Sequence, residues 1–295
     1  MFRDRHISLH EIRYGNMFDF YSRYRLRKIA ETYQPDIVLS WMKRASDFSP
    51  TGPWKSIGRL GGYYNLKYYK HCQYLVCNTK DICKYVVEQG WPPERTRYIP
   101  NFVNEDKSPA MDRSEVNTPL HVPVIVAAGR LHHNKAMDTL INAMAYVDGS
   151  YLWIAGAGPE EGGLKKTVRD LKLEDRVRFL GWRDNISSVY AAADIFVCPS
   201  RHEPLGNVVL EAWVQGIPVI ATMSEGPREL VTDKVNGLLV PVDDATAMAD
   251  AINTLVADKS MAHDLVTAGR KTYEEAFSKK IVVGQYLQFF SELCR

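Results

Sequence analysis

The sequence predicts an α/β protein built from two doubly wound units, each with a parallel sheet. Its 295 residues are about the length of two domains. Short apolar runs alternate with helix-length segments on both sides of residues 104–121, as in parallel strands joined by crossover helices. Residues 104–121 themselves are polar, hold two prolines and lack apolar periodicity. We therefore expect a linker there, with one α/β unit on each side.

The first region shows an incomplete doubly wound pattern. Its strands are expected at residues 7–12, 36–41 and 74–77, with an extended pair at 98–99, and its helices at 17–33 and 81–89. Gly15 is the one glycine among the first fifty residues, so the strand, glycine-rich turn and helix that usually open such a domain are absent. We expect either a chain that lacks the start of this domain or a domain that is itself reduced.

The second region shows a complete doubly wound unit. Its strands are expected at residues 122–128, 151–155, 177–180, 194–198, 218–221 and 237–240. Helices are expected up to about 146 after the loop 129–135, at 160–171, through 193 after a cap at Asp184 or Asn185, and from 207 to a stop at Gly216. A helical turn at 227–231 and a long helical segment that opens at Asp243 follow.

Composition excludes several classes of protein. Hydrophobic residues make up 45% and charged residues 24%, which is ordinary for a folded domain and argues against disorder. No apolar run reaches the ~18 residues of a spanning helix, and the first residues lack the apolar core of a signal peptide. Five cysteines without a C-x-x-C pair fit neither a zinc site nor a disulfide framework. We therefore expect a soluble cytoplasmic protein with reduced cysteines.

Charge is unevenly divided along the chain. Residues 1–118 hold 19 Lys and Arg against 13 Asp and Glu, whereas the remainder is net acidic. One interpretation is that the first half faces an anionic surface or acceptor. The alternative is a solvated basic face with its aromatic residues in the core.

The loop Gly129–Lys135 lies between a predicted buried strand and a helix. Ligands bind at the carboxyl ends of strands in open α/β sheets, and the N-terminus of a helix attracts anions. Arg130 and Lys135 add two cations, so a diphosphate is the ligand that this loop suits. The alternative is a pair of solvated surface cations.

The segment Ser200–Glu211 follows another predicted strand and runs into a helix. Gly206 would let a ligand approach the backbone closely. Glu211 lies in an otherwise apolar helix, where a carboxylate needs partners such as sugar or ribose hydroxyls. The alternative is an ordinary amphipathic helix with Glu203 as an acidic residue before its N-terminus.

Together these segments resemble the retaining GT-B glycosyltransferases of family 4. That family shows G-R-x4-K, A-G-x-G-P and E-P-x-G-N-x-x-x-E in this order. The corresponding residues here are Arg130 with Lys135, Ala155–Pro159, and Glu203–Asn207 leading to Glu211. The resemblance covers about residues 20–295, is strongest over 119–240, and is closest to bacterial lipopolysaccharide and envelope-polysaccharide enzymes. It implies a GT-B fold, in which two Rossmann-like domains face a cleft, the N-terminal one here being incomplete.

The resemblance also implies roles for individual residues. Arg130, Lys135 and Glu203 would be catalytic, the two cations holding the donor diphosphate and Glu203 the transferred sugar. Glu211 would bind the ribose hydroxyls. The full donor-binding set would be Gly129, Arg130, Lys135, Gly158, Trp182, Arg183, Glu203, Leu205, Gly206, Asn207 and Glu211. Within it, Trp182 and Arg183 would line the base pocket, and the N–H groups of 205–207 would hold the sugar or its phosphate.

The resemblance further implies an overall activity and its partners. Residues 1–118, completed by a C-terminal helix at 281–295, would form the acceptor side, and residues 119–280 would bind the donor. The enzyme would move a sugar from a nucleotide diphosphosugar to an envelope glycan or glycolipid with retention of anomeric configuration. It would need no metal and no cofactor, would bind no nucleic acid, and has no D-x-D triplet. The alternatives are a non-catalytic donor-binding remnant with a decayed acceptor domain and, less favoured, a GT-B sugar epimerase.

The chain departs from the family pattern at one catalytic position. A histidine commonly follows the strand that corresponds to 36–41, but Leu39 and Trp41 occupy those places. His132, His133 and His202 are interpreted as solvated or structural, so no histidine is assigned as a base. Residues 59–70, where glycines precede paired tyrosines and lysines, could line the cleft or contact an anionic membrane peripherally at its inner face. The alternative is a helix with tyrosines in the core.

Overall fold

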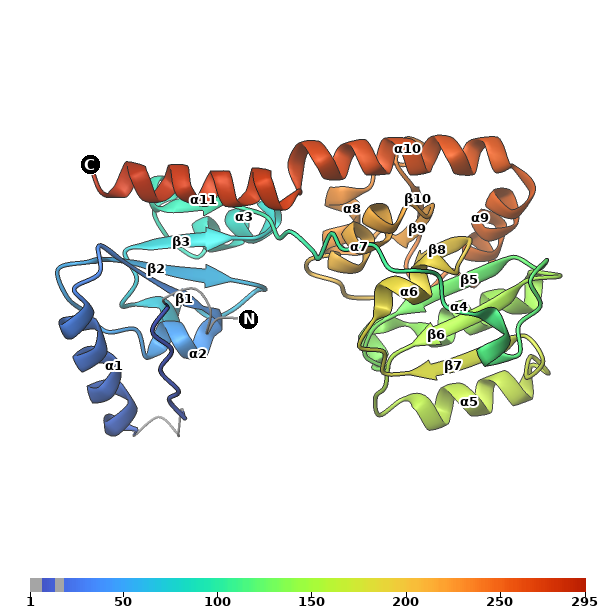
Figure 1. Cartoon of the computed structure of the whole chain (residues 1–295), viewed down its shortest axis with the longest axis horizontal. Coiled ribbons are helices and arrows are strands. Elements are labelled where there is room, and N and C mark those ends of the chain that lie inside the picture. Colours follow the sequence, from blue (N-terminus) through green and yellow to red (C-terminus); the bar gives the residue numbers. More distant parts are fainter. Residues whose placement is uncertain (1–6, 14–18) are drawn as a thin grey trace. The chain divides into compact units, whose positions relative to one another are not determined.

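A computed structural model describes residues 7–13 and 19–295 of the chain. It divides into two compact units, each with its own parallel sheet (Figure 1). The first unit comprises the residues up to Ile99 together with Tyr286–Arg295, and the second comprises Pro100–Gln285. Residues 100–118, which the sequence assigned to the N-terminal domain, thus lie in the second unit.

The first unit has a four-stranded sheet in the order β1-β2-β3-β4. The neighbouring strands are all parallel. The strands are β1 (Ile37–Trp41), β2 (Lys55–Leu60), β3 (Tyr74–Cys77) and β4 (Thr96–Tyr98). The helices are α1 (Phe20–Tyr33), α2 (Met42–Asp47) and α3 (Lys80–Glu88), with 3-10 turns η1 (Leu66–Tyr69) and η2 (Pro93–Arg95).

Two predicted elements of this unit differ from the structure. The strand expected at 7–12 is wrong, because the described residues 7–13 form no strand and are almost all exposed, without a neighbouring strand to pair with. The helix expected from 17 starts at Phe20, where Asp19 caps it by accepting a hydrogen bond from the Ser22 N–H at 2.9 Å. Met17 lies outside the described residues.

Strand β2 has no apolar periodicity that would predict it, because two charged residues and a glycine interrupt it. Gly58 is required there, since a Cβ would lie 2.6 Å from the ring of Tyr69. Arg59 is buried in the same strand and donates from Nε to the hydroxyl of Tyr286 at 2.9 Å. In residues 59–70 the helix is confined to η1, where Tyr69 is fully buried as a core tyrosine.

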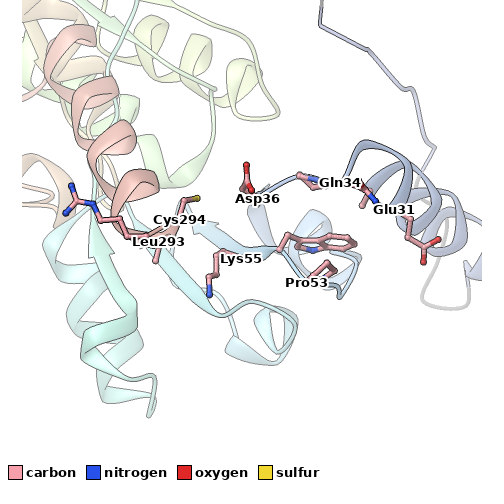
Figure 2. A pocket seen from close by; sticks show the side chains of 11 residues that line it. Glu31, Gln34, Asp36, Pro53, Lys55, Leu293 and Cys294 are labelled. Atoms are coloured by element: carbon pink, nitrogen blue, oxygen red, sulfur yellow. The ribbon is translucent and has the colours of Figure 1, made fainter.

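The C-terminal helix α11 (Lys279–Leu293) completes the first unit with its second half. Phe289 is buried, and its ring meets that of Tyr74 on β3 edge-on at 5.9 Å. A pocket of about 770 Å³ lies between α1, the N-terminal ends of β1 and β2, and the end of the chain. Figure 2 shows Gln34, Asp36 and Lys55 around it.

The second unit has a six-stranded parallel sheet in the order β10-β9-β8-β5-β6-β7. The strands are β5 (Val124–Ala128), β6 (Tyr151–Ala155), β7 (Val177–Gly181), β8 (Ile195–Cys198), β9 (Val219–Thr222) and β10 (Leu238–Val240). All six predicted strands of this region are present, with ends that shift by at most two residues. The chain runs outward from β5 in one direction and then from β8 in the other, so the strand order reverses between them.

Helices cover both faces of this sheet. They are α4 (Met137–Ala143), α5 (Glu161–Asp170), α6 (Ile186–Ala191), α7 (Asn207–Gln215), α8 (Glu225–Leu230), α9 (Ala245–Ala257) and α10 (Lys259–Ala276). The 3-10 turns are η3 (Arg113–Val116), η4 (His133–Lys135) and η5 (Met144–Tyr146). Asp244 caps α9, one residue after the predicted start at Asp243.

The alternation of side chains along the strands divides the core into two layers. Ile125 and Ala127 of β5 belong to the layer under α4, α5 and α9. Val124 and Val126 belong to the layer under α6, α7 and α10, where Trp153 and Trp213 are almost fully buried. Such a core explains why near-continuous apolar runs mark these strands in the sequence.

Residues 104–121 are not a free linker. The Met111 N–H donates to the carbonyl oxygen of Ser188 at 2.9 Å. Arg113 donates to the carbonyl oxygens of Ala192 and Val122 and forms an ion pair with Asp194 at 2.9 Å. These partners hold the segment against the second unit, and such tertiary contacts do not show in a polar sequence. Within residues 7–13 and 19–295, no helix has the length and apolar character needed to cross a membrane.

Candidate functional site

The predicted site residues of the second unit lie at the carboxyl ends of its strands. The loop after β5 holds Arg130 and Lys135, and the loop after the adjacent β8 holds Glu203. These two strands flank the point where the strand order reverses (Figure 1). Loops that diverge from such a point leave a crevice in open α/β sheets, which is where their ligands bind.

Glycines bring the loops after β5 and β6 together. A Cβ at Gly156 would overlap the carbonyl oxygen of Gly129, and one at Gly158 would overlap that of Leu131. The Gly129 N–H donates to the Ala155 carbonyl at 2.9 Å, and the Leu131 N–H donates to that of Ala157 at 3.0 Å. The A-G-x-G-P motif is therefore needed for this close backbone contact, and it fixes the path of the loop that carries the cations.

Lys135 and Glu203 form an ion pair across the reversal point. Lys135 ends η4, and its ammonium group contacts Oε2 of Glu203. Glu203 is only 7% exposed, so its carboxylate depends on this cation to compensate for lost hydration. Lys135 and Glu203 are 68 residues apart in the sequence and are both predicted to lie in one site. The structure brings them into direct contact.

The backbone around Glu203 is held on several sides. The Gly206 N–H donates to Oε1 of Glu203 at 3.4 Å, and the Gly226 N–H donates to the Glu203 carbonyl oxygen at 2.7 Å. Gly206 has a φ of +72°, a left-handed conformation that favours glycine, and it directly precedes α7. The loop therefore turns sharply so that the N-terminus of α7, at Asn207, faces the strand ends.

Glu211 lies one turn into α7 and accepts a hydrogen bond from the hydroxyl of Tyr190 at 3.1 Å. Burial raises the pKa of its carboxyl above the ordinary value. The Tyr190 hydrogen bond and the charge of Lys135 oppose this shift, whereas the charge of Glu203 reinforces it. Glu211 therefore belongs to the same electrostatic cluster as Lys135 and Glu203.

Arg130 differs from Lys135 in its surroundings. Its side chain is exposed, and among the described residues it has no ion-pair or hydrogen-bond partner. It follows β5 by two residues, in the same loop as the paired Lys135. This loop therefore offers one compensated cation and one uncompensated cation.

Trp182 and Arg183 lie farther along the same edge, after β7. Trp182 is 77% exposed and donates from Nε1 to Asp184 at 3.0 Å, and Arg183 donates from Nε to the Leu180 carbonyl oxygen at 3.1 Å. Within the described part of the chain, no hydrogen bond or ion pair joins either of them to Lys135 or Glu203. Their predicted base-binding role stays a prediction.

Sequence reasoning missed Arg201, which connects the two loops. Its guanidinium binds both carboxylate oxygens of Asp138, at 2.9 and 2.7 Å, and contacts Asp243 at 2.6 Å. Asp138 lies in the first turn of α4 and Asp243 follows β10, so no local pattern links the three residues. The neighbouring His202 contacts Glu225 at 2.7 Å, which gives this histidine a structural partner.

Among residues 7–13 and 19–295, no three His, Cys, Asp or Glu side chains gather in a way that could hold a metal ion.

Comparison with known proteins gives this arrangement a family. Residues 122–258 match the family described as glycosyl transferases group 1. The lipopolysaccharide core biosynthesis glycosyltransferase LpsE of Rhizobium meliloti (strain 1021) is 41% identical over 270 residues, which cover 90% of this chain and 79% of LpsE. The chain belongs to the group 1 glycosyl transferases. LpsD of the same strain, also a lipopolysaccharide core biosynthesis glycosyltransferase, is 37% identical over 273 residues, 92% of this chain and 79% of LpsD.

This glycosyl transferase also resembles solved structures. Anabaena HepE, crystallised in complex with UDP, matches with a TM-score of 0.83 and 21% identity over 92% of this chain and 82% of HepE. At this identity the likeness concerns the fold. Together with its two parallel Rossmann-like sheets, it assigns this glycosyl transferase the GT-B fold that the sequence predicts.

Proposed function

We propose that this glycosyl transferase moves a sugar from a nucleotide diphosphosugar to a lipopolysaccharide core acceptor. The acceptor class is supported by LpsE and LpsD, which are named for lipopolysaccharide core biosynthesis and match about nine-tenths of this chain. The donor class is supported by the UDP in the structure of HepE. The chain's own support is the contact of Lys135 with Glu203 at the reversal point of the sheet, beside the uncompensated Arg130.

The donor diphosphate would lie over the loop after β5. Breaking the bond between the anomeric carbon and the diphosphate oxygen builds negative charge on the leaving group. Arg130 and Lys135 would stabilise that charge without reorganisation, because their loop is already fixed by Gly156 and Gly158. A diphosphate would also give Arg130 the anionic partner that it lacks among the described residues.

The remaining predicted residues would hold the two ends of the donor. The free oxygen of Glu211 would accept hydrogen bonds from the ribose hydroxyls, since Tyr190 already binds the other oxygen. Glu203, with the N–H groups of residues 205–207 at the start of α7, would hold the transferred sugar or its phosphate. The base would lie toward Trp182 and Arg183.

The reaction proposed here retains the anomeric configuration, as in glycosyltransferase family 4. The acceptor oxygen would bond to the anomeric carbon from the side that the diphosphate leaves, and the acceptor hydroxyl proton would pass to a diphosphate oxygen. The chain's cations supply charge stabilisation for this step, and the proposal includes no metal ion. The first unit would receive the acceptor, and the enzyme would act in the cytoplasm, where nucleotide sugars are made available to it.

The test separates donor binding from transfer. Thermal unfolding in the presence of UDP, GDP and ADP, each with its sugar derivatives, would identify the donor, because a ligand at 100-fold its Kd stabilises by about 2.7 kcal/mol. The best donor would then be incubated with truncated lipopolysaccharide cores and, as a control, with no acceptor. Sugar transfer with retained configuration is expected. Binding without transfer or hydrolysis would instead identify a donor-binding protein without this activity.

A further inference from the structure

Arg201 has no assigned role in the proposed reaction, yet it makes polar contacts with four residues near the candidate site. Its backbone N–H donates to the Asn134 carbonyl oxygen at 2.9 Å, and its guanidinium donates to that of His133 at 2.8 Å. The same guanidinium binds Asp138 in a bidentate manner and Asp243 at 2.6 Å. We refer to Arg201 with these four partners as the loop clamp.

The loop clamp joins three loops at the carboxyl edge of the sheet. His133 and Asn134 belong to η4, which Lys135 ends, and Asp243 belongs to the loop after β10. Arg201 itself lies two residues before Glu203, in the loop after β8. The loop clamp therefore fixes the backbone on both sides of the ion pair between Lys135 and Glu203, and among the described residues no hydrogen bond or ion pair joins the Arg201 guanidinium to either of these two side chains.

The backbone at the edges of the loop clamp is strained. Ala136, directly after Lys135, has a φ of +49°, and Asp243 has a φ of +59°. Left-handed conformations of this kind are unfavourable at a residue with a Cβ, because the Cβ lies too close to the following carbonyl oxygen. They persist where the surroundings determine the backbone, and here the charged contacts of Arg201 supply those surroundings.

The burial of Arg201 and the pKa of Asp138 both indicate that the charged contacts of the loop clamp are strong. Arg201 is only 18% exposed in its side chain, so its contacts are partly shielded from water. Burial alone would raise the pKa of Asp138, but the hydrogen bonds and charge of Arg201 hold it below its ordinary value. Planar bidentate contacts of this type carry geometric specificity that a lysine does not reproduce.

We infer that Arg201 is a positioning residue that sets Lys135 against Glu203 and thereby determines the affinity for the diphosphate part of the donor. This inference rests on the proposed function, because it assumes that Lys135 binds the diphosphate. Arg201 would not touch the donor. Its loss would release η4 and let Lys135 move with it, while the ribose site at Glu211 in α7 would stay in place.

The experiment compares ligands with and without the second phosphate. Isothermal titration would give the affinities of UDP, UMP, GDP and GMP for wild-type protein and for Arg201→Met, Arg201→Lys and Asp243→Asn. Arg201→Met is expected to weaken the diphosphate that binds best by tenfold or more and its monophosphate by less than threefold. Arg201→Lys should restore part of the diphosphate affinity, and Asp243→Asn should cause a smaller loss with the same selectivity.

Arg270→Met is the matched control, because Arg270 makes the same two kinds of contact as Arg201. It forms an ion pair with Glu274 at 2.6 Å and donates a hydrogen bond to the Val214 carbonyl oxygen at 2.9 Å. It should leave all affinities within twofold. Equal losses for diphosphate and monophosphate, or no loss in Arg201→Met, would overturn the inference about Arg201 alone. If Asp243→Asn, the milder change, lost both ligands equally while Arg201→Met failed to fold, the inference would also fail. A wild-type protein that binds neither these four ligands nor ADP and its sugar derivatives would overturn the proposed function instead.

Discussion

Tyr190 and Glu211 join neighbouring helices through one hydrogen bond of 3.1 Å, from the tyrosine hydroxyl to Oε2 of the carboxylate. Tyr190 is fully buried, and its ring packs edge-on against Phe196 at 5.5 Å. The core therefore fixes Oε2 of Glu211. The direction in which the other oxygen points is then also set before any ligand binds. Burial also raises the pKa of both groups, so the charged form of the Glu211 carboxyl costs stability in the folded protein.

Glu211→Gln should stabilise the protein near neutral pH and weaken donor binding. Because the folded carboxyl has a raised pKa, the folded state keeps a proton that the unfolded chain loses, so wild-type stability falls as pH rises above about 4.5 toward that raised value. The variant has no such slope. Denaturant unfolding from low to neutral pH should show its advantage growing with pH. Affinity for the donor nucleotide should fall by about 10–100-fold, the cost of a hydrogen bond to a charged group. An advantage that shrinks with rising pH would contradict this account.

Lys135→Ala should remove most turnover. The loss of one preorganised donor to developing charge commonly costs ~10²–10³ in rate. Turnover at saturating donor measures it, and far-ultraviolet circular dichroism checks that the variant is folded. Lys166→Ala is the control, because that lysine is exposed on α5 and forms a surface ion pair with Asp170 at 2.6 Å. A rate within about threefold of wild type would exclude Lys135 from charge stabilisation.

Gly158→Ala should destabilise the second unit by about 1–3 kcal/mol, the usual cost of overpacking, because its Cβ would overlap the Leu131 carbonyl oxygen. Gly163→Ala makes the same chemical change in α5, where no atom beyond the adjacent residues and the helix's own backbone lies within 4 Å of the new Cβ. It should stabilise by about 0.5–1 kcal/mol through helix propensity. Urea unfolding of both variants would measure the difference, and two changes of the same sign would refute the role of the glycine contact.

Lys172→Gly should stabilise the protein by about 0.5–1 kcal/mol. Lys172 follows α5 with a φ of +56° and is exposed, so glycine relieves strain without loss of packing. Lys166→Gly, inside the same helix, should instead cost about 1 kcal/mol. Thermal midpoints of the pair give the comparison. A Lys172→Gly protein that melts earlier than wild type would show that its side chain has a stabilising contact.

Periodicity predicted the second unit well because its strands are buried on both faces and end at glycines or polar loops. The strand at 151–155, for example, is predicted and observed with the same ends. In the first unit, β2 was missed because Arg59 is buried through its partner Tyr286, more than two hundred residues away in sequence. The prediction of a linker at residues 104–121 failed for a similar reason. The guanidinium of Arg113 donates hydrogen bonds to carbonyl groups that include that of Ala192, which is distant in sequence.

The candidate site divides in the same manner. Lys135, Glu203 and Glu211 could be found because each stands in a local motif whose residue types suggest a ligand, and the structure brings their charges together. Arg201 could not, because Asp138 and Asp243 become its partners only through the order of the strands. Trp182 and Arg183 follow β7 without a motif of their own and bond to Asp184 and to the Leu180 carbonyl oxygen, so their base-binding role rests on the family resemblance.

The pairing of β5 with β8 has a consequence for how the protein is made. Ile125 aligns with Ile195, 70 residues farther along the chain, and β6 and β7 are inserted between them in sequence. Contacts of such long range form late, because a large loop must close before they contribute. In a nascent or partly folded chain Lys135 and Glu203 are therefore not yet together, so binding of the proposed nucleotide-sugar donor would report that the strands on both sides of the reversal point have assembled.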